Sequence, residues 1–235
     1  MDVLVEGLGP CTVVAVHGIQ GTRGSWRPVV QRLAEVRWVL PNLRGRGTAW
    51  RGAGPLDYTL DRFAAELAEV VRLHVPEGPY VLAGWSLGAS ISVEALASGR
   101  LRRPEGLLLV SGSPVLQQTR WFEGDHAALA RSVIARRQRW GLQDHADDVA
   151  VQHTWQAVRH SDQRAVLARL AVPAVVMHGR DDDDCPPAHA AWLSQGLGAA
   201  CHLLNGVGHG VLSQAPDAVA AQLAALCRVP APPVS

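Results

Sequence analysis

The fold of this chain is decided by the stretch Tyr80-Val81-Leu82-Ala83-Gly84-Trp85-Ser86-Leu87-Gly88. An apolar run leads into a G-x-S-x-G motif, and a helical pattern starts immediately afterwards. This order is typical of a strand, a tight turn and a helix, in which the turn holds the serine in a strained backbone conformation. Side chains at positions 84 and 88 would collide where strand and helix nearly touch, which explains the glycines. The motif predicts a nucleophilic hydroxyl on Ser86, although the motif alone also suits a serine that caps a helix.

Outward from this stretch, short apolar runs alternate with longer segments of helical periodicity. Such alternation is typical of βαβ units around a mostly parallel sheet, and strands covered on both faces are apolar throughout. We expect strands at Val3–Val5, Thr12–Val16, Trp38–Leu40, Tyr80–Ala83, Leu107–Val110, Ala174–Met177 and Cys201–Leu204. We expect helices at Ser25–Ala34, Thr59–His74, Leu87–Ser98, Pro187–Leu197 and Ser213–Cys227.

One segment, residues 114–170, interrupts this alternation. It shows helical patterns around Ala127–Trp140 and Asp147–His160 and no convincing strand. A segment this long within a compact domain predicts a helical cap rather than a loop. We therefore expect an α/β core formed by residues 1–113 and 171–229, a cap over 114–170, and a flexible proline-rich tail over 230–235.

Composition excludes several classes of partner and cofactor. The chain has 235 residues, 48% of them hydrophobic, which is enough for one substantial core. Its net charge of +1 gives no field that would draw it to nucleic acid or an anionic membrane, and no apolar run approaches a bilayer span. All 22 basic residues are arginine, so lysine Schiff-base chemistry and a covalently held pyridoxal cofactor are excluded. We expect no cofactor, no metal, no nucleic acid and no membrane partner.

The four cysteines carry no recognisable pairing or metal-binding pattern. There is no CxxC pair, no spacing typical of zinc ligands and no preceding secretory signal. We expect reduced, buried thiols in a cytoplasmic protein at Cys11, Cys185, Cys201 and Cys227.

A serine hydroxyl becomes an effective nucleophile only when an imidazole takes its proton and a carboxylate orients that imidazole. The serine of this motif is usually followed by the acid and then the histidine. His209, in Gly206-Val207-Gly208-His209-Gly210, lies between the last expected strand and the last helix and is the predicted base. His178 ends a strand, and we assign it a structural role.

Four carboxylates, Asp181 to Asp184, follow the strand Ala174–Met177 and compete for the role of the acid. Sequence physics alone does not separate them. At least two must belong to a solvated acidic turn, because four adjacent charges could not all be desolvated.

The tetrahedral intermediate of acyl transfer needs two backbone N–H donors. One is the N–H of Leu87, at the start of the helix that follows the nucleophile. The other should come from the loop His17-Gly18-Ile19-Gln20-Gly21, in which Ile19 is the predicted donor.

Five motifs occur here in the order in which they occur in α/β-hydrolases, and the chain resembles that family over nearly its whole length. They are His17-Gly18, Pro41-Asn42-Leu43-Arg44-Gly45-Arg46-Gly47, Gly84 to Gly88, Gly179-x-x-Asp182-x-x-x-Pro186 and Gly208-His209. The resemblance implies the α/β-hydrolase fold, with a mostly parallel central sheet flanked by helices and a short helical cap. The family's G-x-x-D-x-x-x-P spacing implies that Asp182 is the acid, with Asp181 and Asp183 as alternatives.

Within the family, the sequence Gly-Trp-Ser-Leu-Gly, the short chain and Trp121-x-x-Gly124 resemble the carrier-protein methyl esterases of biotin synthesis. That resemblance implies removal of a methyl ester from a pimeloyl group on acyl carrier protein, with cap arginines meeting the acidic partner. A solvated helix face is the alternative explanation for these arginines, which are Arg131, Arg136, Arg137 and Arg139.

Trp85 flanks the nucleophile, and other tryptophans lie in the entry loop and the cap. We expect an aromatic acyl pocket that includes Trp85, Trp26 and Trp121, with packing of the core and cap as the alternative use of these side chains. The predicted activity is that of a serine carboxylesterase acting on a small-molecule ester. A carbon–carbon bond hydrolase or a lactonase would use the same triad, and a non-catalytic ligand receptor on the same fold is the alternative from another class.

Overall fold

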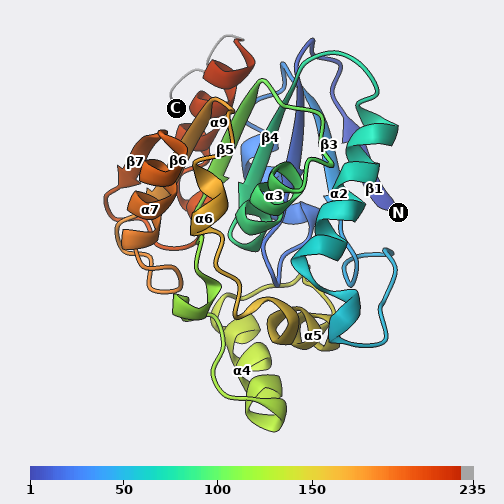
Figure 1. Cartoon of the computed structure of the whole chain (residues 1–235), viewed down its shortest axis with the longest axis vertical. Coiled ribbons are helices and arrows are strands. Elements are labelled where there is room, and N and C mark those ends of the chain that lie inside the picture. Colours follow the sequence, from blue (N-terminus) through green and yellow to red (C-terminus); the bar gives the residue numbers. More distant parts are fainter. Residues whose placement is uncertain (229–235) are drawn as a thin grey trace.

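A seven-stranded sheet forms the centre of the computed structural model, which describes residues 1–228 apart from the side chain of His126. The strand order is β1-β3-β2-β4-β5-β6-β7; β1 pairs antiparallel with β3, and all other pairs are parallel. This confirms the predicted mostly parallel sheet (Figure 1). The predicted tail, 230–235, lies outside the described residues. The strands are β1 (Asp2–Glu6), β2 (Thr12–Val16), β3 (Arg37–Asn42), β4 (Tyr80–Trp85), β5 (Gly106–Val110), β6 (Ala174–Gly179) and β7 (Ala200–Leu204).

Helices cover both faces of the sheet and bury a separate apolar core on each. Because successive strand residues point to opposite faces, Val14 packs in the core with α2, α3 and α7, whereas Val13 packs with α1, α8 and α9. Figure 1 shows α2 and α3 in front of the sheet. The helices are α1 (Arg27–Val30), α2 (Leu60–His74), α3 (Leu87–Ala97), α7 (Ala188–Leu197), α8 (Val211–Gln214) and α9 (Pro216–Cys227).

Two predicted helices are broken in the structure. The helix expected over Ser25–Ala34 is a 3₁₀ turn, η1 (Arg23–Trp26), followed by the single turn of α1. The helix expected over Ser213–Cys227 is divided into α8 and α9 at Pro216, because proline lacks the N–H that a continuous helix would need and instead suits a first helical turn.

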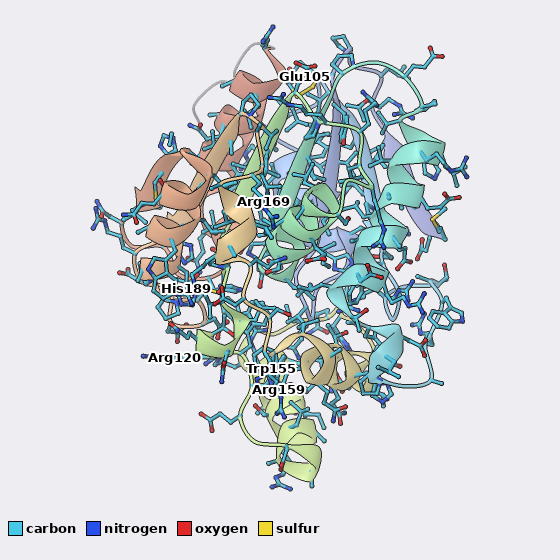
Figure 2. All side chains as sticks on the ribbon, in the orientation of Figure 1. Glu105, Arg120, Trp155, Arg159, Arg169 and His189 are labelled. Carbon is cyan, nitrogen blue, oxygen red and sulfur yellow. A yellow bond between two sulfur atoms is a disulfide. The ribbon has the colours of Figure 1, made fainter. Side chains whose placement is uncertain are left out.

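Residues 114–170 form mainly helices, and α4 and α5 lie beyond the carboxyl ends of the central strands (Figure 1). Trp155 of α5 and Arg159, the residue directly after this helix, are labelled at this end of the molecule in Figure 2. An isolated bridge between Val115 and Asp162 brings the two ends of the excursion together. The last helix of this segment, α6, packs against α7 beside the central sheet. The elements are η3 (Leu116–Gln118), α4 (His126–Arg139), α5 (Asp148–Val158) and α6 (Arg164–Leu167).

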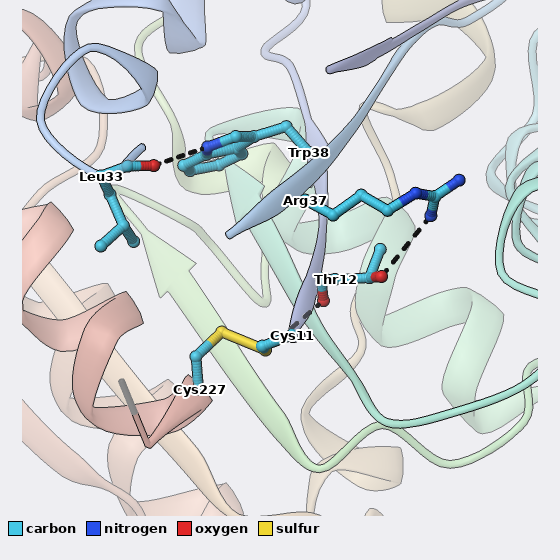
Figure 3. Close-up of a disulfide and its surroundings, with 6 residues drawn as sticks. All are labelled: Cys11, Thr12, Leu33, Arg37, Trp38 and Cys227. Carbon is cyan, nitrogen blue, oxygen red and sulfur yellow. Dashed lines mark hydrogen bonds between the residues drawn. A yellow bond between two sulfur atoms is a disulfide. The ribbon is translucent and has the colours of Figure 1, made fainter. Parts of the chain in front are cut away.

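A disulfide joins Cys11, just before β2, to Cys227, the last residue of α9 (Figure 3). The expectation of four reduced, buried thiols is therefore wrong: two are paired, Cys201 is exposed, and only Cys185 fits the description. No spacing pattern revealed the pair, because its members lie 216 residues apart and meet only through the sheet topology. Disulfides persist mainly in oxidising compartments, so the cysteines no longer support the predicted cytoplasmic location.

Among residues 1–228, none of the helices is both long enough and apolar enough to cross a bilayer.

Candidate active site

Ser86 occupies the turn between β4 and α3. Its backbone conformation, with φ 57° and ψ −121°, is one that residues other than glycine rarely adopt. The packing around the turn enforces it. A β-carbon at position 84 would lie 2.4 Å from the carbonyl oxygen of Gly88, and one at position 88 would lie 2.3 Å from that of Val16. The N–H of Ser86 donates to the carbonyl of Val110 at 2.9 Å. The glycines thus let strand and helix approach closely enough to hold the serine at the sheet edge.

The structure brings Ser86, His209 and Asp182 together in one buried row. Ser86 Oγ lies 2.9 Å from His209 Nε2, and His209 Nδ1 lies 2.9 Å from Asp182 Oδ2. A carboxylate accepts only, so Nδ1 carries the ring proton and Nε2 is left to accept from the serine hydroxyl. This geometry suits removal of a proton from Ser86. Asp181 and Asp183, the alternatives for the acid, are exposed.

Asp182 is surrounded by hydrogen-bond donors. Its Oδ1 accepts from the N–H groups of Asp184 and Cys185 at 3.0 and 2.8 Å, and its Oδ2 lies 3.1 Å from His178 Nε2. Burial by itself would raise the pKa of Asp182, but the charge of His209 and these hydrogen bonds outweigh burial and hold that pKa well below its usual value. His178 is thus a member of the site that the sequence reasoning missed; its signal was its place four residues before Asp182 at the end of the same strand.

The two predicted oxyanion donors belong to two elements next to Ser86: the start of α3 at Leu87 and the loop after β2 at Ile19. Leu87 is the first residue of α3, so its N–H has no carbonyl partner within the helix. Ile19 is buried in the loop after β2 and lines the same cavity as Ser86. A β-carbon on the neighbouring Gly18 would lie 3.0 Å from the Trp85 ring and 3.2 Å from the β-carbon of Ser86, so glycine lets this loop lie close to Ser86 without crowding.

The Pro41–Gly47 motif braces the loop that carries Ile19. His17 Nε2 accepts from the N–H of Leu43 at 3.1 Å, and the buried Arg46 guanidinium donates to the carbonyl of Ile19. Burial and the charge of Arg46 lower the pKa of His17 to about 3, although the carbonyl of Gly18 opposes them. The His17 ring is therefore neutral at pH 7 and keeps Nε2 as an acceptor.

A small cavity of about 30 Å³ lies over Ser86 and His209. The Trp85 ring is 5.6 Å from the His209 ring, and its Nε1 donates to the carbonyl of His209 at 3.1 Å. The Trp140 ring meets His209 edge-on at 6.1 Å. The complete lining is Ile19, Gln20, Gly21, Trp85, Ser86, Arg136, Trp140, Leu142 and His209.

Two of the three predicted pocket tryptophans lie elsewhere. Trp26 is fully buried in the core with α1, α8 and α9, and Trp121 packs against Trp155 with ring centroids 5.7 Å apart. Both therefore serve packing, and this part of the pocket prediction is wrong. Trp140, which follows the last residue of α4, takes their place because residues 140–142 lie over the same cavity as Ser86.

The predicted basic face of the cap is largely neutralised by carboxylates of the same chain. Arg136 is buried and donates to Asp184 at 2.6 Å, and the half-exposed Arg139 donates to the other oxygen of Asp184 at 2.6 Å. Arg137 pairs with Asp148 at 3.1 Å. Three of the four arginines considered for an acidic partner are therefore paired within the chain, and Arg131 is the exposed member for which the structure gives no ion pair among the residues described.

Comparison with known proteins gives relatives across almost the whole chain. Residues 13–222 match the alpha/beta hydrolase family. The chain is 27% identical to the pimeloyl-[acyl-carrier protein] methyl ester esterase of Nitrosomonas europaea, over 84% of this chain and 87% of the relative. It is 25% identical to a 2-succinyl-6-hydroxy-2,4-cyclohexadiene-1-carboxylate synthase of Serratia proteamaculans, over 90% and 91%. A solved esterase of Exiguobacterium antarcticum matches with a TM-score of 0.78 at 20% identity, over 96% and 95%.

Proposed function

This chain belongs to the alpha/beta hydrolase family and is an ester-hydrolysing enzyme, and we propose that it works through a covalent acyl-Ser86 intermediate. The observation that carries the proposal is the 2.9 Å contact between Ser86 Oγ and His209 Nε2, with Asp182 on the far nitrogen of the same ring. Together with the strained turn at Ser86, this contact supports a nucleophile that is already paired with its base.

In the proposed reaction, His209 takes the hydroxyl proton while Ser86 Oγ attacks the ester carbonyl carbon. The developing oxyanion accepts hydrogen bonds from the N–H groups of Ile19 and Leu87, each worth roughly 3–4 kcal/mol to the transition state. The alcohol leaves with the proton held by His209, and a water molecule then attacks the acyl-enzyme with His209 again as base. Asp182, kept ionised by its donors, orients the ring and stabilises the imidazolium in both steps.

The lining of the cavity supports an apolar acyl group. Trp85, Trp140 and Leu142 offer apolar surface, and because the closed cavity holds only about 30 Å³, far less than a ligand pocket, this wall has to move to admit a substrate. Because Trp140 and Leu142 come from the 114–170 segment, we propose that this segment acts as a cap over the site. The substrate class that we favour is therefore a small-molecule ester.

A methyl ester on acyl carrier protein is a narrower candidate. It is supported by the likeness to the Nitrosomonas europaea enzyme, but the cap arginines that would meet an acidic protein are mostly paired internally. The likeness to the Serratia proteamaculans synthase keeps a different reaction on the same triad as the alternative.

The test combines active-site labelling with a substrate panel. A fluorophosphonate should add once to the wild-type protein and not to Ser86→Ala, whereas a receptor without a working site would stay unlabelled. p-Nitrophenyl esters of increasing acyl length, an acyl-carrier-protein methyl ester and a vinylogous diketone then separate the substrate classes. Absence of labelling and of turnover on every substrate would overturn the proposal.

A further inference from the structure

One guanidinium, that of Arg136 on α4, joins two loops of the proposed site. Its Nη1 donates to Gln20 Oε1 at 2.7 Å, and its Nη2 donates to Asp184 Oδ2 at 2.6 Å. Gln20 directly follows Ile19 in the oxyanion loop, and Asp184 lies two residues after Asp182 in the acid loop. All three bridging side chains are buried.

Each end of this bridge is tied to a group that the proposed reaction uses. Through its backbone N–H, Asp184 donates to Asp182 Oδ1 at 3.0 Å. Gln20 makes two further hydrogen bonds to the 114–170 segment. Its side-chain Nε2 donates to the carbonyl of Val133 at 2.8 Å, and its backbone carbonyl accepts from the N–H of Ala146. A shift of α4 would therefore pull on both loops.

The same helix closes the site. Ser86 is 1% exposed and His209 is 1% exposed, with Arg136 and Trp140 of the cap among the residues over them. An ester can reach Ser86 only after this segment moves away, and that movement separates Arg136 from Gln20 and Asp184. Closure over a bound substrate restores both contacts.

We propose that Arg136 is a positioning residue: by docking on Gln20 and Asp184 together, it sets the oxyanion donor and the triad acid in their reactive places only when the cap is closed. This inference rests on the proposed function. The planar guanidinium fork suits the task, because it reaches two acceptors in fixed directions, whereas a lysine ammonium is a point charge on a flexible stem.

The bridge predicts a specific kinetic pattern. Arg136→Lys keeps the charge opposite Asp184 but loses the fixed link to Gln20, so kcat for p-nitrophenyl butyrate should fall about 10- to 100-fold, as small misplacements of reacting groups do. KM should change by less than about threefold, because the apolar wall formed by Trp85, Trp140 and Leu142 is kept. Arg139→Gln is the matched control: it breaks an ion pair with the same Asp184 from an exposed position, and its kcat should stay within about twofold to threefold of wild type.

A double-mutant cycle distinguishes loss of the bridge from general structural damage as the cause of a lower kcat. Gln20→Met removes the other end of the bridge, and Arg136→Lys combined with Gln20→Met should lose little more kcat than either single variant, because the bridge breaks only once. Gln20→Met carries the test by itself if Arg136→Lys fails to fold, because it should show the same fall in kcat with KM nearly unchanged.

Two results would overturn the inference: a wild-type kcat in both Arg136→Lys and Gln20→Met, or an equal fall in Arg139→Gln. Failure of the proposed function is a separate result, because it would appear as a wild-type protein that neither turns over esters nor reacts with fluorophosphonate at Ser86.

Discussion

His178 Nε2 lies 3.1 Å from Asp182 Oδ2, the same carboxylate oxygen that faces His209. The acid of the site therefore contacts two imidazoles rather than one, and it also receives two backbone N–H groups. His178 Nε2 also lies 2.8 Å from the carbonyl of Cys185, to which it donates, and because both imidazoles are fully buried, solvent does not compete for these contacts. This arrangement fixes the carboxylate in one orientation before a substrate arrives.

We expect His178→Leu to lower kcat/KM about tenfold, because the carboxylate loses one of the donors that orient it and outer partners of this kind are commonly worth a factor of that order. His178→Gln, which keeps an N–H donor, should restore much of the loss. Steady-state kinetics with p-nitrophenyl butyrate measures both. Equal activity in His178→Leu and wild type would show that the contact has no role in the reaction.

We expect Asp182→Asn to lower kcat by about four orders of magnitude, because the amide favours the wrong tautomer of His209. Asp181→Asn and Asp183→Asn are matched controls from the same loop with exposed side chains, and their kcat should stay within about twofold of wild type.

Ser86→Ala and His209→Ala should each lower kcat by several orders of magnitude. A near-normal rate in His209→Ala would mean that another base operates.

Acid should destabilise the fold through His17. The unfolded chain has the ordinary histidine pKa of 6.5, whereas the folded protein holds it at about 3, so between these values the unfolded state binds a proton that the folded state excludes. The free energy of unfolding should therefore fall as the pH drops from 6.5 towards 3, by up to about 1.4 kcal/mol per pH unit. Asp182, with its lowered pKa, adds to the fall in the same direction below its ordinary value of 3.8.

Urea unfolding at pH 7, 6, 5 and 4 measures this slope. His17→Gln, whose amide is neutral throughout, should flatten it, whereas the same change at the exposed His160 should not. Equal slopes for wild type and His17→Gln would refute the assignment.

The fold could be predicted from sequence because its signals are local. Each strand is a short apolar run, and Gly84 and Gly88 mark the turn where backbone contact forbids side chains. Ser86, Asp182 and His209 could be predicted to lie together because each belongs to a motif that follows a strand. The carboxyl ends of parallel strands lie at the same edge of a sheet.

The features that could not be predicted are contacts between side chains that lie far apart in the sequence. Asp184, the partner of Arg136 and Arg139, lies more than 40 residues away from both, so no charge pattern within the cap showed that they were paired. The choice of Trp140 over Trp26 for the cavity likewise depends on how the cap folds back, which periodicity does not encode.

The disulfide should stabilise the protein, because it links residues 216 positions apart and thus restricts the unfolded chain. Cys11→Ser with Cys227→Ser should lower the free energy of unfolding by roughly 2–5 kcal/mol, and Cys201→Ser, at an exposed site on β7, should leave it unchanged within about 0.5 kcal/mol. Thiol titration of the denatured, unreduced protein should find the two free cysteines, Cys185 and Cys201. Four reactive thiols would contradict the pairing.

Trp140→Ala should shift the enzyme towards longer acyl chains. The Trp140 ring lies edge-on to His209 and closes one side of a cavity of only about 30 Å³, so removing it enlarges the space beside Ser86. Relative kcat/KM values across p-nitrophenyl acetate, butyrate, octanoate and decanoate should move their maximum by at least one member of the series. Trp50→Ala is the control, because that tryptophan is 57% exposed and does not line the cavity. An unaltered preference in Trp140→Ala would place the acyl group elsewhere, and the cap tryptophan would then only shield His209 from water.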